Sequence, residues 1–373
     1  MKKTAFIWDE SYFWHNTGGG ALFEPAVGYI QELGFVENPE SKRRVVNLLH
    51  RSGLMEQLIQ IKPIPATEEQ LELFHTKKHI ENVQYLSQTT GGDCGDSAIV
   101  GIGSYEIAKL SVGGAITAVK TVLQNPEITR AYALTRPPGH HAEADRGVGF
   151  CIFNNAVIAA KVAQKEHGVG KIAIVDWDAH HGNGIEDAFY ADNNVLFISL
   201  HQEGYDPAHR GNMEDIGEGA GKGFNINIPL QAGCGDAVYK YAFDQIVTPA
   251  IDNFAPELII VSAGQDAGFF DPLSRMMVTT QGYGYMTNSL KRMADKHAHG
   301  RLVALHEGGY CASYVPFCTH AIIEKLSGIT TDVGDPFLYS MAGTTYNTLL
   351  PHQKERIDKI TNIQKESVSH ETY

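Results

Sequence analysis

Short apolar runs that end in polar or glycine-rich loops recur along this chain of 373 residues. The runs are rich in residues typical of strands, and between them lie segments whose apolar residues return at helical spacing. Five runs, each with the loop that follows it, stand out: "AYALT" (131–135) before "RPPGHHAEADRG", "KIAIVD" (171–176) before "WDAHHGNG", "NVLFISL" (194–200) before "HQEGYDP", "ELIIVSAG" (257–264) before "QDAGFFDP", and "LVALH" (302–306) before "EGGY".

The helical segments close with Gly or Pro, as in residues 155–170 and 237–256. Strands that alternate with helices predict an α/β fold, with a mainly parallel central sheet covered by helices on both faces. No repeat, low-complexity tract or linker divides the chain, so we expect one domain over residues 1–373. Apolar residues at 357, 360 and 363 predict a final packed helix, and residues 366–373 are expected to fray.

The polar loops all follow the carboxyl ends of predicted strands. In open parallel sheets, ligands bind in the crevice outside those ends. We therefore expect the five loops to converge on one site. A glycine-rich segment, "YFWHNTGGGALFEPAVGYIQELG" (12–34), is expected either to cover that site or to form a contact between subunits of a homo-oligomer.

Composition and charge narrow the class of protein. A hydrophobic content of 43% is that of a globular protein, and no apolar run approaches the length of a signal or membrane-spanning segment. The net charge of −13 disfavours nucleic acid and favours a cationic partner. Five cysteines without a CxxC spacing suggest neither a disulfide framework nor a thiolate zinc site. These features predict a cytoplasmic protein without membrane contact.

Candidate metal ligands follow two of the predicted strands. Asp178 and His180, two positions apart, can both point into the crevice, and Asp266 holds the same place after another strand. One histidine with two carboxylates suits Zn²⁺ and leaves a coordination position for water or substrate. The same donors would accept Fe²⁺, Co²⁺ or Mn²⁺. We therefore predict a single metal site, with Zn²⁺ as the first candidate.

Candidate acid and base groups lie in the other loops. A hydrolase needs a base for the attacking water and an acid for the departing amine, and the adjacent His140 and His141 fit these two tasks. Asp176 and Asn183 are natural hydrogen-bond partners for the two rings. Tyr310, after two glycines, could donate a hydrogen bond to an oxyanion.

The blocks "RPPGHHA", "GFCIFNN", "DWDAHHGNG", "SAGQDA" with "DPL", and "EGGY" resemble the signature blocks of the zinc-dependent histone deacetylase and acetylpolyamine amidohydrolase superfamily. The match runs in order from about residue 9 to residue 328. It is most similar to class II enzymes and their bacterial relatives, the histone deacetylase-like amidohydrolases. The resemblance implies an arginase-like α/β fold and hydrolysis of acetyl-lysine or a similar acylated amine.

The resemblance also implies roles for particular residues. It places zinc on Asp178, His180 and Asp266, and makes Tyr310 the group that polarises the scissile carbonyl. A narrow tunnel for the acyl-lysine stem would be lined by Gly149, Phe150, Leu273 and the loop at Asp206. Two potassium sites are implied, the first by Asp176, Asp178, His180, Ser199 and Leu200, the second by Phe189, Asp192, Val195 and Phe224.

Three positions depart from the usual pattern of the family. Asn183 stands where class I enzymes have an aspartate, which should leave His141 less basic. Gln265 replaces the usual apolar residue before the metal aspartate. In the loop at 202–211, Tyr205 and Asp206 stand where a tunnel phenylalanine usually precedes the proline, so one tunnel wall should be more polar.

Alternative functions leave different marks on the same residues. A dinuclear ureohydrolase would need further aspartates where this chain has Gly182 and Gly268, so a mononuclear site is expected. A non-catalytic acyl-lysine binder is a further alternative, although Tyr310, both histidines and all three candidate ligands are present. Leu273 at the rim favours acyl-lysine, whereas Glu203, Asp206 and the negative net charge favour an acetylpolyamine. No nucleophile elbow and no phosphate-binding loop is found.

Overall fold

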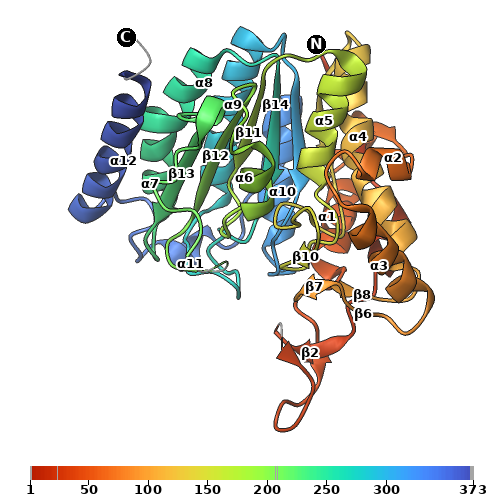
Figure 1. Cartoon of the computed structure of the whole chain (residues 1–373). Coiled ribbons are helices and arrows are strands. Elements are labelled where there is room, and N and C mark those ends of the chain that lie inside the picture. Colours follow the sequence, from red (N-terminus) through yellow and green to blue (C-terminus); the bar gives the residue numbers. More distant parts are fainter. Residues whose placement is uncertain (1, 23, 206, 208, 370–373) are drawn as a thin grey trace.

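An eight-stranded sheet, parallel throughout, forms the centre of the computed structural model (Figure 1). The structure describes residues 2–22, 24–205, 207 and 209–369. In spatial order the strands are β13 (Asn225–Leu230), β12 (Val195–Gln202), β11 (Ile172–Asp176), β14 (Leu258–Ala263), β15 (Leu302–His306), β9 (Ile128–Ala133), β1 (Lys3–Ile7) and β5 (Ile59–Ile61).

Helices cover both faces of this sheet. One face packs against α4 (Ser104–Gln124), α5 (Asn155–His167) and α6 (Asn183–Phe189). The other packs against α1 (Glu40–Arg51), α7 (Asp236–Ala242), α8 (Thr248–Phe254), α9 (Thr280–His297), α10 (Val315–Ser327) and α12 (Pro351–Ser369). The remaining helical elements are α2 (Glu68–Leu71), α3 (Lys77–Gln88), α11 (Leu338–Met341), 3-10 turns at Glu10–Trp14, Met55–Gln57 and Gly219–Gly221, and a π-helical turn at Phe243–Val247.

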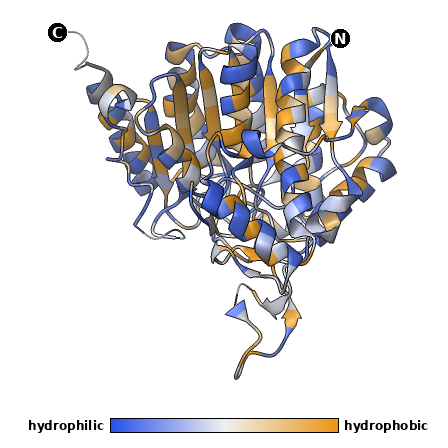
Figure 2. Cartoon of the chain, turned by 45° about the vertical axis from the view of Figure 1, so that its right-hand side comes forward, coloured by the Kyte–Doolittle hydropathy of each residue, from blue (hydrophilic) through white to orange (hydrophobic). Residues whose placement is uncertain are grey.

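The strands are apolar on both sides because both faces are buried. In β11, Ala173 and Val175 belong to the core under α7–α10, whereas Ile172 and Ile174 belong to the core under α4–α6. Successive side chains of a strand point to opposite faces, so a continuous apolar run fills both layers. Figure 2 shows these central strands in the colour of hydrophobic residues. The predicted α/β class with helices on both faces is confirmed.

The five predicted strands all lie in the central sheet, with small differences at their ends. The largest is at β9, which begins at Ile128, three residues before the predicted start. Three further strands of the central sheet were not predicted. β1 and β5 are short, and β13 reads "NINIPL", in which buried asparagines interrupt the apolar residues. The predicted final helix is α12, in which Ile357 and Ile360 are buried.

Small sheets lie at the carboxyl end of the central sheet. They pair β7 (Gly95–Asp96) with β10 (Gly147–Val148), β6 (Gly92–Asp93) with β8 (Ile99–Val100), and β2 (Gly19–Ala21) with β3 (Glu24–Pro25) and β4 (Leu33–Gly34). The segment that carries β2 projects from the molecule as a finger at the bottom of Figure 1. Its contact with a second subunit stays a prediction.

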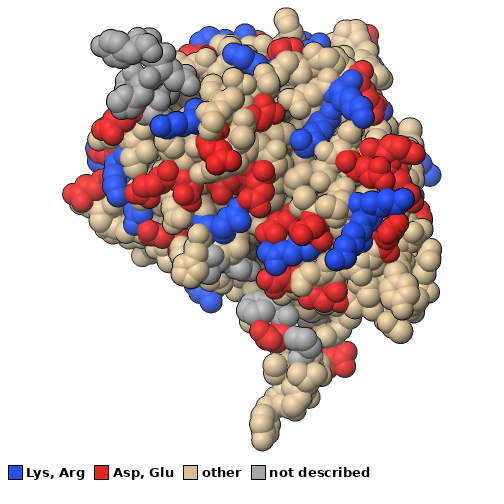
Figure 3. All heavy atoms as spheres, viewed as in Figure 1, with Lys and Arg blue, Asp and Glu red and all other residues tan. Residues whose placement is uncertain are grey.

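Acidic and basic side chains are interspersed over the face shown in Figure 3, and the finger is largely uncharged. Among the described residues of this face, no region is purely acidic or purely basic over a large area. Within the described ranges, no helix combines the length and the apolar character needed to cross a membrane.

Candidate active site

A cavity of about 390 Å³ opens at the carboxyl end of the central sheet. It receives a residue from four of the five predicted loops, His141, His180, Tyr205 and Tyr310, and Leu273, which directly follows the fifth loop. The fold therefore brings the predicted loops together at this cavity. The cavity is completed by Glu24, Asp96, Ser97, Gly149 and Phe150.

The three candidate metal ligands lie together beside this cavity. One donor atom from each of Asp178, His180 and Asp266 falls within 4.8 Å of the other two. The Nδ1 atom of His180 is 2.8 Å from Oδ2 of Asp266 and 3.1 Å from Oδ1 of Asp178. All three residues are buried. Two carboxylates and an imidazole that converge in this way form a donor set suited to one divalent cation.

The surroundings of these ligands fix their orientation. The Nε2 atom of His180 lies 3.1 Å from the carbonyl oxygen of Leu273, which can only accept, so Nε2 carries a proton and Nδ1 is the nitrogen that faces the two carboxylates. The backbone N–H of Gly308 donates to Oδ2 of Asp178 at 2.8 Å. A Cβ on Gly308 would lie 2.4 Å from Oδ2 of Asp266, and one on Gly264 would lie 2.1 Å from Oδ2 of Asp178. Only glycine fits at these two positions.

Burial and like charge oppose one another at this cluster. Burial raises the pKa of Asp266 to about 6, and the adjacent Asp178 carboxylate acts in the same direction. Burial favours neutral His180, but its hydrogen bonds to both carboxylates outweigh this effect and raise its pKa well above the usual range. Two carboxylates, Asp178 and Asp266, are thus buried side by side, and burying them in the charged form requires a positive partner. A divalent cation fits that need.

The two adjacent histidines each have their own partner. His140 Nδ1 is 2.9 Å from Oδ2 of Asp176, and His141 Nδ1 is 2.8 Å from Oδ1 of Asn183. The two rings lie 4.0 Å apart between centroids. His141 lines the cavity, and Nε2 of His140 is 3.7 Å from Oδ2 of Asp178. The structure therefore brings the four predicted residues into two pairs beside the metal ligands.

The different partners give the two rings opposite pKa shifts. For His140, burial alone would lower the pKa, but the carboxylates of Asp178 and Asp176 outweigh burial and raise it to about 10. For His141, burial and the neighbouring His140 lower the pKa well below its usual value. Separated values of this kind are typical of residues that divide acid and base tasks.

Gly149 and Phe150 form one wall of the cavity. Gly149 has φ +52° and Phe150 has φ +68°, a left-handed conformation that non-glycine residues rarely adopt. The Phe150 ring packs edge-on against Phe35 and Tyr310, with centroids 5.5 Å and 5.7 Å apart. Leu273 joins the same apolar cluster. The predicted tunnel residues 149, 150 and 273 therefore lie on the cavity wall.

Tyr205 adds a hydroxyl-bearing ring to the cavity lining. Its ring lies 5.4 Å from the ring of His180 and contributes to the cavity lining. Asp206, the other predicted polar residue of this loop, lies outside the described residues. Gln265 is buried behind Asp266, where its Nε2 donates to the carbonyl of Ala263 at 2.6 Å.

Tyr310 is held by a carboxylate that sequence reasoning missed. Oδ2 of Asp271 accepts from the backbone N–H groups of Tyr310 at 2.7 Å and Cys311 at 3.3 Å. Oδ1 of the same side chain accepts from the N–H of Leu273 at 2.9 Å. One buried aspartate thus ties the loop of Tyr310 to the loop of Leu273. Its only sequence signal was its place in "FFDPL" after a metal-ligand loop.

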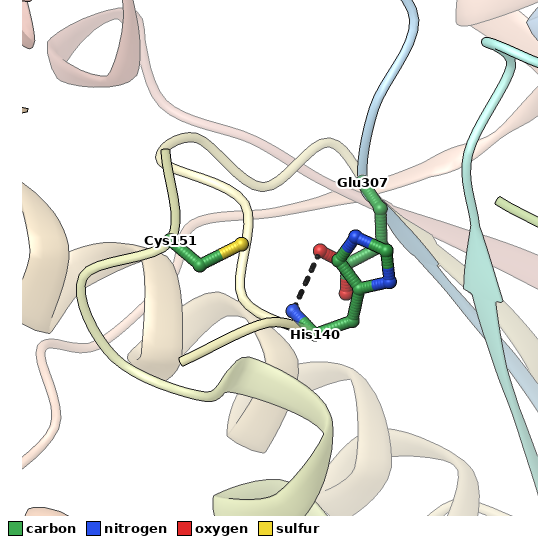
Figure 4. A group of neighbouring side chains, drawn as sticks. All are labelled: His140, Cys151 and Glu307. Carbon is green, nitrogen blue, oxygen red and sulfur yellow. Dashed lines mark hydrogen bonds between the residues drawn. The ribbon is translucent and has the colours of Figure 1, made fainter. Parts of the chain in front are cut away.

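The Glu307 side chain holds the loop that carries His140 and His141. Its Oε2 accepts from the N–H groups of Gly139 at 2.6 Å and His140 at 3.3 Å. Figure 4 shows the Glu307 carboxylate against His140, with Cys151 nearby. His140, Cys151 and Glu307 are close enough to share an ion, but burial raises the pKa of the Cys151 thiol and keeps it protonated. We interpret this group as a hydrogen-bonded support for His140.

A buried ionic cluster lies beside Tyr310. Arg136 Nε donates to Oε1 of Glu37 at 3.0 Å, and Lys42 Nζ lies 3.3 Å from the same oxygen. Lys42 Nζ is also 5.5 Å from the centroid of the Tyr310 ring. Arg136 and Glu37 are 99 positions apart in the chain, so no local sequence motif predicts this cluster.

The predicted potassium ligands lie on two stretches of neighbouring backbone. Asp176 and Ser199 are direct partners across β11 and β12. Phe189 ends α6, Val195 begins β12, and the Phe224 carbonyl already accepts from the N–H of Phe197 at 2.9 Å. Both cation sites stay predictions.

Comparison with known proteins agrees with this architecture. The histone deacetylase domain family matches residues 35–326. A histone deacetylase-like amidohydrolase of Pseudomonas aeruginosa is 46% identical over 338 residues, which cover 90% of this chain and 89% of the relative. Histone deacetylase 8 of Arabidopsis thaliana is 33% identical over 346 residues, covering 88% of this chain and 90% of the relative. The crystal structure of the HDA15 HD domain superposes with a TM-score of 0.86 at 30% identity and covers 99% of this chain and 96% of that one.

The fold and the matched relatives define a hydrolase with an α/β deacetylase fold. The chain belongs to the histone deacetylase family.

Proposed function

We propose that this chain is a zinc-dependent deacylase that hydrolyses the amide of acetyl-lysine or a similar acylated amine. The observation that carries the proposal is the convergence of Asp178, His180 and Asp266, whose donor atoms lie within 4.8 Å of one another beside a cavity of about 390 Å³. His141 and Tyr310 line the same cavity, and the ring of His140 lies against that of His141.

The residues fit a divalent metal, with Zn²⁺ as the first candidate. Asp178 and Asp266 supply carboxylate oxygens, and His180 supplies Nδ1 because its Nε2 is engaged by the Leu273 carbonyl. When bound, the ion would act as a Lewis acid and lower the pKa of a coordinated water. Mixed oxygen and nitrogen donors also accept Fe²⁺, Co²⁺ and Mn²⁺, so elemental analysis of the purified protein identifies the native metal.

The histidines would handle the protons. Water that adds to the carbonyl must lose a proton, and His141, whose partner is the neutral amide of Asn183, has no carboxylate to favour its charged form. It is the base in this proposal. His140 is paired with the Asp176 carboxylate, which favours the imidazolium, so it would stabilise developing negative charge and supply a proton to the departing amine.

Tyr310 and the apolar wall would orient the substrate. The Tyr310 hydroxyl would donate to the oxygen that gains charge as the carbonyl becomes tetrahedral. Phe150 and Leu273 would enclose the aliphatic stem of the amine, because both belong to one apolar cluster on the cavity wall. A slim unbranched stem satisfies this shape.

A second substrate class is supported by the cavity mouth. Glu24 and Asp96 line the cavity, and acidic groups there would attract the ammonium groups of an acetylated polyamine. Leu273 at the wall instead suits the uncharged stem of acyl-lysine. We therefore place acyl-lysine first and acetylpolyamine second. Potassium at the two predicted sites and a cytoplasmic location belong to the same proposal; the five free cysteines support a reducing compartment.

The proposal is tested by the release of acetate from acetyl-lysine peptides and from N-acetylputrescine, before and after treatment with a chelator. Turnover of either substrate that stops on chelation and returns with added Zn²⁺ supports the proposal. Turnover that survives complete metal removal contradicts it. A folded, zinc-loaded protein that cleaves neither substrate but binds acetyl-lysine peptides would be a binding protein.

A further inference from the structure

The amide of Asn183 is held in one orientation by two different neighbours. Its Oδ1 is 2.8 Å from Nδ1 of His141. Its Nδ2 donates to Oε1 of Glu143 at 3.0 Å and, over a longer 3.4 Å, to the backbone carbonyl of His141. An amide oxygen can only accept, so in this orientation His141 must carry its proton on Nδ1. The lone pair of the neutral ring is then on Nε2.

The opposite orientation of the amide would reverse the ring. The two ends of an asparagine side chain have nearly the same shape, and only their hydrogen-bond partners distinguish them. With the amide turned over, its NH₂ group would face Nδ1 of His141. The ring proton would then move to Nε2, and the ring could not accept a proton there.

Glu143 is the closer of the two acceptors that favour the first orientation, and as a carboxylate it only accepts hydrogen bonds. A reversed amide would set Oδ1 of Asn183 against Oε1 of Glu143, two acceptors without a proton between them. Arg146 also contacts Glu143, as its Nε donates to Oε2 at 2.8 Å and its Nη2 to Oε1 at 3.2 Å, but the Arg146 side chain is half exposed, so this ion pair contributes little. The Glu143 side chain is only 17% exposed, so water competes weakly for these bonds.

We propose that Glu143 is a positioning residue that fixes the tautomer of His141 through the Asn183 amide. The inference rests on the proposed function, because it concerns the ring that would act as base. The Glu143 carboxylate thus acts on His141 indirectly, through the neutral Asn183 amide that lies between them. Glu143 itself does not line the 390 Å³ cavity, so substrate binding should not depend on it.

The first test compares Glu143→Met with Arg146→Ala. Loss of a partner that orients a catalytic ligand typically lowers activity about ten- to hundredfold. For Glu143→Met we expect kcat to fall by that factor, with KM within about twofold of the parent value. Arg146→Ala leaves the Glu143–Asn183 bond intact, so we expect kcat within about threefold of the parent. Unchanged kcat in Glu143→Met, or an equal loss in Arg146→Ala, would overturn the inference.

A rescue separates orientation from general damage. An aspartate at 183 presents an acceptor to His141 whichever way its carboxylate turns. In the Glu143→Met background, Asn183→Asp should therefore recover at least about fivefold of the lost kcat, because a carboxylate hydrogen bond again holds the proton on Nδ1. If the double variant is no better than Glu143→Met alone, the loss does not come from the amide.

A readout without turnover keeps this inference distinct from the proposed function. The ¹⁵N chemical shifts of the His141 ring report which nitrogen carries the proton. We expect the proton on Nδ1 in the parent protein, and a mixed or Nε2-protonated ring in Glu143→Met. If the protein cleaves no amide but the ring changes in this way, the deacylase proposal fails and the positioning role stands. A ring with the same tautomer in both proteins would overturn the role.

Discussion

The α-carbon of Gly149 packs so closely against the imidazole of His141 that an added Cβ would lie 2.7 Å from Cδ2 of the ring. Nothing larger than hydrogen fits between this part of the cavity wall and the proposed base. The ring is thereby trapped between Gly149 on one side and the Asn183 amide at its Nδ1. The absence of a side chain at position 149 thus allows the His141 ring to keep its orientation.

Gly149→Ala is expected to lower kcat by about a hundredfold, because a displacement of about 1 Å at a catalytic group can have that effect. The matched control is Gly168→Ala. Gly168 also has a positive φ, +65°, but an added Cβ there meets nothing within 4 Å. Both variants bear a backbone strain of about 1 kcal/mol, seen in thermal unfolding, but only Gly149→Ala should lose turnover. Equal activity of the two variants would contradict the contact.

Tyr310→Phe should lower kcat by a factor of about 10² to 10³, the usual effect of removing one oxyanion donor. Metal content should not change, because Tyr310 is not among the three grouped ligands. Steady-state kinetics and elemental analysis on the same preparation measure both quantities. Tyr85→Phe, at a side chain that is largely exposed, is the control. A fully active Tyr310→Phe protein would remove the tyrosine from the mechanism.

Asp271→Asn should impair both loops that this carboxylate joins. An asparagine keeps one acceptor and turns an NH₂ group toward backbone N–H groups of Leu273 or of Tyr310 and Cys311. We expect a loss of about 1–3 kcal/mol in unfolding free energy and, since Tyr310 and Leu273 both shift, a lower kcat with a higher KM. Urea unfolding and kinetics check this. The exposed Asp332→Asn should change neither, and an unaffected Asp271→Asn would show that the anchor is dispensable.

His75 predicts acid sensitivity away from the active site. It is buried, and its Nε2 accepts from the N–H of Asn154 at 2.9 Å, so the folded protein needs the neutral ring. Burial lowers its pKa to about 3, from about 6.5 in the unfolded chain. The unfolded state therefore binds more protons between these values. The stability that His75 contributes is complete above pH 6.5 and is lost as the pH falls toward 3.

His75→Gln keeps an acceptor for Asn154 but cannot titrate. Between pH 6 and 4, the slope of unfolding free energy against pH should therefore be smaller in His75→Gln by about 1.4 kcal/mol per pH unit, the value for one proton. Urea unfolding at several pH values gives both slopes. Parallel slopes for the parent and the variant would show that His75 does not titrate in this range.

The sequence predicted those parts of the fold and site that local patterns encode. Continuous apolar runs identified five central strands, and the loops after them carried the residues that meet at the cavity. β13 escaped prediction because its asparagines face inward: Nδ2 of Asn225 and of Asn227 donate to Glu186 at 2.8 Å and 2.7 Å. A polar residue that is buried by pairing with a distant side chain breaks the apolar pattern without breaking the strand.

The supporting residues of the site could not be read from local spacing. Glu307 contacts the N–H of Gly139 from 168 positions away, and Arg136 meets Glu37 across 99 positions. Asp271 and Glu143 stand close to motif residues, yet their roles depend on which backbone and amide groups the fold turns toward them. Long-range hydrogen bonds follow from tertiary structure and leave no periodic trace in the sequence.

The central claim is that Asp178, His180 and Asp266 hold one metal ion. Titration of the metal-free protein with Zn²⁺ by calorimetry tests it most directly, in the parent and in Asp266→Ala. We predict one high-affinity site per chain in the parent and its loss in the variant, with both proteins folded by circular dichroism. A stoichiometry of two, no binding by the parent, or unchanged affinity in Asp266→Ala would contradict the account.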